Sequence, residues 1–182
     1  MDKGDEGSMV RIRQETLSDH AAVYTLVKEA FESAAHADGN EADLVEALRR
    51  SEAFIPELSL VAEMGTEAGE TIVGYILFTE AHVGGQTVLA LAPLAVLPAF
   101  QRQGVGTALI REGHRIAGQL GYPYSVVLGS EQYYPRAGYQ RAECYGIRPP
   151  FDVPADNFMA YALQGDAKPM DGVLEYAKEF GI

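Results

Sequence analysis

The chain has 182 residues, of which 47% are hydrophobic and 22% are charged, a balance typical of a globular domain and not of a disordered segment. Lys and Arg total 14 against 26 Asp and Glu, so the formal net charge is −12. We do not expect so acidic a chain to bind nucleic acid or an anionic membrane surface, because both need clustered Lys and Arg. The charge favours cationic ligands, including protonated amines.

Cysteine content and hydropathy exclude further classes of protein. Cys144 is the single cysteine, which excludes an intrachain disulfide, and Cys and His do not occur at zinc-site spacing, so no metal is expected. The longest apolar run, residues 88–100, contains prolines and is too short to span a bilayer. Because the N-terminus lacks an apolar signal core, we expect a cytoplasmic protein. We interpret the charged, Gly-rich residues 1–8 as a tag or disordered tail before a natural start at Met9. A monomer and a homodimer are both open.

The first part of the chain predicts a strand and two helices. Residues 10–13 alternate like a short strand. Thr16 precedes Asp19 by three positions, which resembles a capping box with Asp in place of Glu. Apolar residues at helical spacing then predict a helix over about 17–32. Asn40 is placed to cap a second helix that has one apolar face.

The pattern then changes to strands. Residues 58–64, 71–83 and 86–97 have the composition of strands, and Gly84-Gly85 predicts a tight hairpin between the last two. Pro93 lies inside the third of these strands and cannot donate a hydrogen bond to a sheet ladder. It therefore predicts a bulge, or a place where neighbouring strands part.

The rest of the chain predicts a helix after Gly106, which Gly121 ends, and then short strands. In chain order we expect a buried strand over 124–130, a brief helix over 132–137, a strand from Tyr139, a Pro-rich crossing over 148–157 and a last strand over 158–163. Cys144 falls in the strand from Tyr139, where we expect it to pack. Residues 164–182 fit either a helix or a strand, and we expect them to extend the same domain. The element order predicts a mixed α/β (α+β) sheet with helices on both faces, in one domain over 9–163.

One segment, residues 96–110, combines a strand end, a Gly-containing loop and a helix start. The loop holds Gly104 and Gly106, and the helix begins at once. Helix N-termini present free N–H groups and a partial positive charge, and glycines let an anion approach the backbone. The segment therefore predicts a cradle for phosphate or pyrophosphate, with Arg102 adding a charged contact.

Two common glycine-loop fingerprints do not fit this segment. A Walker A loop needs Lys and then Ser or Thr, and no Lys follows Gly106. A Rossmann fingerprint needs Gly or Ala where Leu109 stands. On the two glycines alone, a helix cap without a ligand is an equal alternative.

Two motifs together resemble a known family. Gln-x-x-Gly-x-Gly at residues 101–106, after an apolar strand, resembles motif A of the GCN5-related N-acetyltransferases, the GNAT superfamily. Further on, Tyr-Tyr-Pro-Arg-Ala-Gly-Tyr at residues 133–139 resembles the family's second signature. The wider segments LAPLAVLPAFQRQGVG and LGSEQYYPRAGY are similar to the bacterial YhbS-like branch. The element order matches the family's fold over residues 10–163.

The resemblance implies a GNAT fold with a mostly antiparallel central sheet, which binds acetyl-CoA in a crevice where two central parallel strands splay apart. Here those strands are the one that contains Pro93 and the one over 124–130. The pantetheine amides would pair with backbone groups like an added strand, and loop amides would hold the pyrophosphate. The implied cofactor-binding residues are Ala95, Val96, Gln101, Arg102, Gln103, Gly104, Val105, Gly106 and Thr107.

By the same resemblance, Tyr134 matches the family's general acid. Attack of an amine on a thioester expels a thiolate, and a free thiol has a pKa of about 8.5 while that of Tyr is about 10. A phenol beside the sulfur can therefore give its proton to the leaving group as charge develops. The alternative is that Tyr134 is an aromatic core residue, which is the role we expect for Tyr133.

A general base is harder to assign. Family members commonly place a Glu on the strand before the glycine loop, and residues 86–97 contain no acidic residue. Other candidates at strand ends are Glu63, Glu80, His82 and Glu131. Each is alternatively a solvated surface charge, and a water relay from backbone carbonyls is equally open. We expect three further histidines to be bystanders: His20, His36 and His114.

The resulting hypothesis is an N-acetyltransferase that transfers the acetyl group of acetyl-CoA directly to a primary amine in a ternary complex. A backbone N–H near Val96 would face the oxyanion. The acceptor would be a small molecule or a protein, and the acidity of the chain favours a cationic one. The alternatives are a CoA-binding module without transfer, which the missing strand Glu supports, and a phosphate-binding regulatory domain, which leaves residues 133–139 unexplained.

Overall fold

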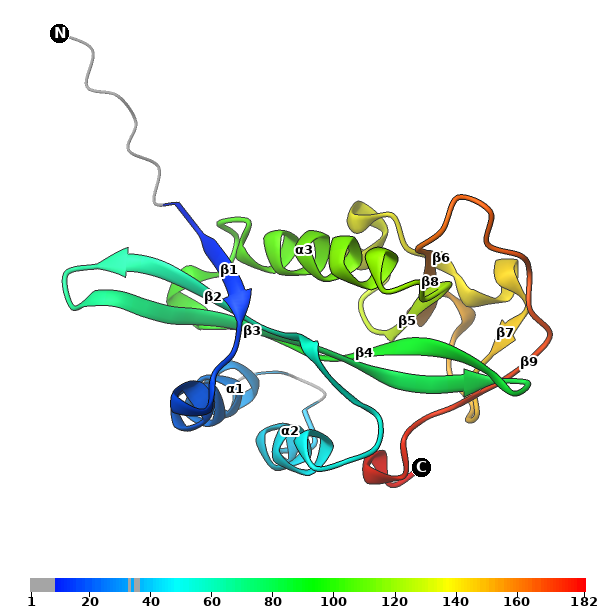
Figure 1. The fold of residues 1–182 in the computed structure, drawn as a ribbon, viewed down its shortest axis with the longest axis horizontal. Helices are drawn as coiled ribbons and strands as arrows, with labels where there is room; N and C mark the ends of the chain where they lie inside the picture. The colour runs from blue at the N-terminus through cyan, green and yellow to red at the C-terminus, as the bar shows by residue number, and fades with distance from the viewer. Residues whose placement is uncertain (1–8, 33, 35–36) are drawn as a thin grey trace, which may run out of the picture.

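The computed structural model describes residues 9–32, 34 and 37–182; the predicted tail and His36 lie outside them. In this part of the chain nine strands form a sheet whose main path is β1-β2-β3-β4-β5-β8-β6 (Figure 1). Every neighbouring pair on this path is antiparallel except β4 with β5. The strands are β1 (Arg11–Gln14), β2 (Phe54–Thr66), β3 (Gly69–Val83), β4 (Gln86–Val96), β5 (Tyr124–Leu128), β6 (Gln140–Arg141), β7 (Ile147–Arg148), β8 (Phe158–Ala162) and β9 (Gly172–Glu175). The predicted mixed, mostly antiparallel sheet is confirmed.

Helices cover both faces of the sheet, as the sequence predicts (Figure 1). On one face lie α1 (His20–Glu32), preceded by the 3-10 turn η1 (Leu17–Asp19), and α2 (Glu41–Arg49). On the other face lies α3 (Val105–Gln119). Separate clusters of buried apolar side chains fill the two interfaces, and burial of this surface stabilises the layers.

The approach of α3 to the sheet depends on a glycine. Leu109, Ile110 and Ala117 form the buried face of the helix with Gly113. A Cβ atom at Gly113 would lie 2.3 Å from the ring of Phe78 on β3. The missing side chain therefore lets the helix lie directly over that ring.

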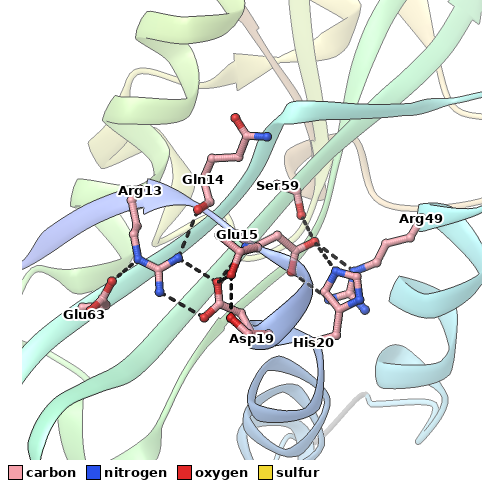
Figure 2. A network of polar contacts seen from close by, with 10 residues as sticks. Arg13, Gln14, Glu15, Asp19, His20, Arg49, Ser59 and Glu63 are labelled. Atoms are coloured by element: carbon pink, nitrogen blue, oxygen red, sulfur yellow. Dashed lines mark hydrogen bonds and ion pairs between the residues drawn. The ribbon is translucent and has the colours of Figure 1, made fainter.

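A polar junction fixes the start of α1 against the first two strands (Figure 2). Arg13 on β1 donates to both carboxylate oxygens of Asp19, at 2.7 and 3.0 Å, and also contacts Glu63 on β2. The Thr16 backbone N–H donates to Asp19 Oδ2 at 2.7 Å, which realises the predicted capping-box arrangement. The Arg13 guanidinium holds the pKa of Asp19 well below its usual range, so the carboxylate is charged at neutral pH.

A second network connects α2 to the sheet (Figure 2). Arg49 donates to the Glu15 carboxylate at 2.9 and 2.8 Å, and Ser59 Oγ donates to the same carboxylate at 2.5 Å. Ser59 Oγ also lies 2.6 Å from Tyr75 Oη. Glu15, Ser59 and Tyr75 are buried and the Arg49 side chain is largely so, and removal of one partner would therefore leave a buried polar group unsatisfied. No local pattern in the sequence predicts this network.

The central strands part where the position of Pro93 predicts it. β4 and β5 pair only at Leu89 with Ser125 and at Ala90 with Val126. Two residues later the register between β3 and β4 shifts, so that β4 bulges at Pro93. Beyond the bulge β4 still pairs with β3, but no described strand pairs with its other edge.

The C-terminal part of the chain adds a strand, which decides between the two alternatives for residues 164–182. β9 pairs antiparallel with β3, at Val83 with Leu174, and parallel with β7. The 3-10 turn η6 (Lys178–Phe180) follows, and Phe180 packs against the cluster beneath α1 and α2.

The expectation for Cys144 is wrong. The strand from Tyr139 is only two residues long, and a 3-10 turn, η4 (Ala142–Tyr145), replaces the rest of it. Cys144 is exposed on that turn. Apolar alternation over so few residues does not distinguish a strand from a short turn.

Candidate functional site

A cleft of about 910 Å³ lies where β4 and β5 part. Its walls come from the end of β4, from the loop and first turn of α3, and from the segment after β5. The lining residues are Leu94, Val96, Phe100, Gln101, Arg102, Gly104, Val105, Gly106, Thr107, Ser130, Tyr133, Tyr134 and Arg136. The structure therefore brings the two sequence motifs together around one cavity.

The edge of β4 presents to this cleft backbone groups that pair with no described strand. The Leu97 N–H donates to Val73 O on β3 at 2.9 Å. In an antiparallel ladder, alternate residues direct their N–H and C=O to opposite edges. The N–H and C=O of Val96, paired with Gly74, therefore point to the edge that has no partner strand. An extended amide-containing ligand can pair there as an added strand.

The loop before α3 has the features of an anion cradle. Gly104 is the N-cap residue, with φ 85° in the left-handed region, and no atom lies within 4 Å of the position of a Cβ there. Among the described residues, no acceptor is recorded for the backbone N–H groups of residues 102–107, whereas Ala108 N–H donates to Gly104 O at 3.0 Å. These N–H groups and the helix dipole favour a negatively charged ligand.

Gly106 lies against Tyr133 at the first turn of α3. A Cβ at Gly106 would lie 2.2 Å from Tyr133 Oη, so the phenol, not open space, occupies the room that glycine leaves. Tyr133 packs against the core beneath α3, as expected, but its hydroxyl also lies beside the first turn of the helix. Burial raises the pKa of Tyr133, so the phenol is neutral and does not repel an anion.

Two glutamines brace the loop. Gln101 Nε2 donates to Val96 O at 3.1 Å, and Gln103 Nε2 donates to Ala99 O at 3.2 Å. Arg102 between them is exposed, with φ 64°. Of the implied cofactor-binding residues, all line the cleft except Ala95 and Gln103. The Ala95 side chain is buried on the face beneath α1 and α2.

Tyr134 lies across the cleft from the loop, at the start of the 3-10 turn η3 (Tyr134–Ala137). Its ring packs edge-on against Tyr133 and Tyr139, with centroids 5.1 and 5.6 Å away. The position of a Cβ at Gly129 lies 2.4 Å from the ring, so this glycine admits it. No hydrogen bond within the described chain involves the Tyr134 hydroxyl. Burial, with a smaller contribution from Tyr133, raises the pKa of Tyr134, so the phenol is protonated at neutral pH.

None of the four candidate bases lines this cleft. Glu63 contacts Arg13, and Glu131 accepts a hydrogen bond from Asn157 Nδ2 at 2.7 Å. Glu80 accepts from Tyr122 Oη at 2.7 Å and lines, with His82, a separate cleft of about 670 Å³ between α2, β3 and the C-terminal turn. The geometry therefore assigns no side-chain base, and a relay through water is the interpretation that fits the cleft.

Two of the histidines expected to be bystanders are in the described chain. His114 on α3 stacks on Tyr161, with ring centroids 4.1 Å apart, and shares a 2.9 Å hydrogen bond with Tyr139 Oη. Burial lowers the pKa of His114 to about 4. His20 lies 3.9 Å from the Glu15 carboxylate. Within the described residues no group of three or more His, Cys, Asp or Glu is arranged to hold a metal, and no helix is long and apolar enough to cross a membrane.

Comparison with known proteins identifies the class to which this fold and cleft belong. The model of the acetyltransferase (GNAT) family matches residues 20–139. The chain belongs to this family. The Escherichia coli K12 N-acetyltransferase YjhQ is 38% identical over 145 residues, which cover 76% of this chain and 78% of YjhQ. The N-acetyltransferase YhbS of the same strain is 31% identical over 172 residues, which cover 93% of this chain and 97% of YhbS.

Two solved structures are similar over nearly the whole chain. The crystal structure of the Escherichia coli GNAT family N-acetyltransferase YhbS in complex with CoA has a TM-score of 0.86 at 29% identity, and the match covers 100% of this chain and 97% of that one. A GNAT family acetyltransferase from Brucella melitensis in complex with acetyl-CoA has a TM-score of 0.77 at 31% identity, and covers 95% and 99%. The resemblance to the YhbS-like branch is confirmed.

Proposed function

We propose that this N-acetyltransferase binds acetyl-CoA in the cleft between β4 and β5 and transfers the acetyl group to a primary amine. The observation that carries the proposal is the position of the parted strand edge beside the free N-terminus of α3, with Tyr134 on the opposite wall. The complexes of YhbS with CoA and of the Brucella melitensis protein with acetyl-CoA support it.

The cleft has groups that bind both the pyrophosphate and the pantetheine arm of acetyl-CoA. The N–H groups of residues 103–107 and the Arg102 guanidinium hold the pyrophosphate, where the helix dipole also favours negative charge. The pantetheine arm lies along the free edge of β4, and its amides pair with backbone groups of that edge next to Val96, whose N–H is left for the thioester. The thioester then lies near the point where the two strands part.

Transfer needs one bond formed and one broken. The neutral amine attacks the thioester carbonyl, and a tetrahedral intermediate forms whose oxyanion accepts a hydrogen bond from the backbone N–H of Val96. Collapse of the intermediate breaks the C–S bond, and Tyr134 Oη gives its proton to the departing thiolate. The proton lost by the amine passes to water, and Tyr134 recovers a proton from solvent.

The acceptor amine belongs to a small molecule or a protein. The net charge of −12 favours a cationic acceptor, whose ammonium form must lose a proton before it attacks. The cytoplasmic location stays a prediction, and a monomer and a homodimer both stay open.

A release assay separates the enzyme from a CoA-binding module without transfer. The chain is incubated with acetyl-CoA and each member of a panel of primary amines, including polyamines, aminosugars and a lysine peptide, while free thiol is followed. We expect thiol release that requires both the amine and the protein, with the acetylated amine recovered by mass. Binding of acetyl-CoA by calorimetry without amine-dependent release would support the module instead.

A further inference from the structure

A small cationic pocket adjoins the cofactor cleft. It has a volume of about 360 Å³ and lies between α3, η3 and the end of β8. Arg111 and Arg115 from α3 and Arg136 from η3 line it, and Arg136 lines the cofactor cleft as well. In a chain with only 14 Lys and Arg against 26 Asp and Glu, such a gathering of arginines runs against the overall charge.

Two of these arginines have uncompensated charge. Arg115 is bound to the Glu112 carboxylate on the same helix, with two contacts of 3.1 Å, so its charge is largely neutralised within the protein. No ion pair with a described residue involves Arg111 or Arg136. His114 adds no charge at neutral pH, because burial lowers its pKa to about 4. The pocket therefore presents two free guanidinium groups from opposite walls.

The helix α3 sets the distance between this pocket and the loop that forms the pyrophosphate cradle. Thr107 is in the first turn of α3 and lines the cofactor cleft, and Arg111 follows it by four residues, so both lie on one face of the helix. One helical turn rises about 5.4 Å, so the Arg111 backbone stands about that far along the helix from the pyrophosphate cradle. Arg136 faces both places from the other wall.

We propose that Arg111 and Arg136 bind the 3′-phosphate of CoA. The inference rests on the proposed function, because it takes the pyrophosphate to lie on the loop before α3. The 3′-phosphate is joined to the pyrophosphate through one ribose ring, a span on the order of one helical turn. A phosphate dianion also matches two guanidinium groups, whose N–H donors form charge-assisted hydrogen bonds to phosphate oxygens. These arginines would then make the protein distinguish CoA from dephospho-CoA.

Calorimetric titration with CoA and dephospho-CoA tests this assignment. The proteins are the wild type, Arg111→Gln, Arg136→Gln and the double variant. Arg148→Gln is the matched control, because Arg148 is an exposed arginine on β7, paired with Asp171 at 2.7 Å, and its loss changes the net charge equally. We expect the wild type and the control to bind CoA about tenfold or more tightly than dephospho-CoA. In the double variant we expect the ratio to fall to about one, through weaker binding of CoA alone.

The outcomes separate this inference from the proposed function. A double variant that keeps the wild-type ratio of the two affinities would overturn the role of Arg111 and Arg136. Equal loss of affinity for both ligands would also overturn it, because the arginines would then act on the pyrophosphate or through the general field. A wild-type protein that binds neither CoA nor dephospho-CoA would instead contradict the proposed cofactor site.

Discussion

Tyr133 and Tyr134 are adjacent in the chain, but their hydroxyl groups lie in different surroundings. The Tyr133 hydroxyl occupies the space that Gly106 leaves beside the first turn of α3. The Tyr134 ring is enclosed by Tyr133, Tyr139 and Gly129, while its hydroxyl has no recorded protein partner in the described chain. Tyr134 is therefore a partly buried, protonated phenol that lines the cofactor cleft, where it can donate a proton.

Tyr134→Phe removes this proton donor and keeps the ring. We expect kcat to fall about a hundredfold, while the KM for acetyl-CoA and the affinity for CoA change little. Steady-state kinetics from pH 6 to 10 make the measurement, and the deficit should narrow as the pH rises if thiolate leaves unaided. Tyr133→Phe is the matched control and should retain most of kcat. Full activity of Tyr134→Phe across the range would make Tyr134 a packing residue.

Thr107 offers a way to weaken cofactor binding without strain in the fold. Thr107 is the third residue of α3 and lines the cleft. An acidic side chain at this position interacts favourably with the helix dipole and so stabilises the helix. We expect Thr107→Asp to lower the affinity for acetyl-CoA at least tenfold, about 1.4 kcal/mol, because its carboxylate repels the pyrophosphate. Calorimetry and a melting curve give both quantities, with Thr107→Ser as control. An intact fold with unchanged affinity would place the pyrophosphate elsewhere.

Within the helix α3, we expect two glycines to respond in opposite ways to replacement by alanine. Gly113 faces Phe78, where a Cβ would lie 2.3 Å from the ring, whereas the nearest atom to a Cβ at Gly118 is Leu163 O at 3.4 Å. We expect Gly113→Ala to destabilise the fold by about 1–3 kcal/mol through overpacking. Gly118→Ala should be neutral or stabilise by up to about 1 kcal/mol, because alanine favours a helix. Urea unfolding measures both, and equal effects would show that α3 does not lie this close to β3.

Much of the element order follows from local pattern, and so does the break in the sheet. Periodicity places the helices and long strands, and Pro93 marks where β4 bulges and leaves β5, because proline cannot join a ladder. Short elements are less predictable: two-residue β6 and the turn that exposes Cys144 have too few residues to show a period. The strand β9 depends on its pairing with β3 and β7, which no local pattern reveals.

Some parts of the candidate site can likewise be predicted from the sequence, and other parts depend on the fold. The glycine loop is visible in the sequence because its chemistry is local, and the resemblance adds Tyr134 from a second motif. The contact of Tyr133 with Gly106, and the network of Glu15, Arg49 and Ser59, join residues far apart in the chain, so only the fold brings them together. Arg136 is in the second motif, but its place beside Arg111 depends on how η3 packs against α3.

At the scale of the whole molecule, charge is distributed unevenly. The chain carries a net charge of −12, yet the cofactor cleft and the adjoining pocket are lined by arginines, and no Asp or Glu of the described residues lines either of them. An anionic cofactor therefore meets a locally favourable potential in a protein that otherwise attracts cations. The two substrates, one anionic and one expected to be cationic, can be drawn to different surfaces of the same molecule.

The free energy of unfolding at acid pH depends on His114. Its folded pKa of about 4 lies below the ordinary 6.5, so the unfolded chain binds a proton that the folded chain does not. The stabilisation is fully present above pH 6.5 and is lost as the pH falls towards 4, by up to about 3 kcal/mol. We expect His114→Gln, which can keep the hydrogen bond to Tyr139, to flatten the free energy of unfolding between these pH values. Equal slopes in both proteins would show that His114 is not buried in its neutral form.

A crystal structure of the chain with acetyl-CoA would show directly where the cofactor binds. We expect the pyrophosphate within hydrogen-bond distance of the N–H groups of residues 103–107, the pantetheine along the edge of β4 at Val96, and Tyr134 Oη beside the sulfur. Acetyl-CoA bound elsewhere on the molecule would contradict the cofactor site in this cleft, and a thioester sulfur far from Tyr134 would contradict the role of Tyr134 as the acid.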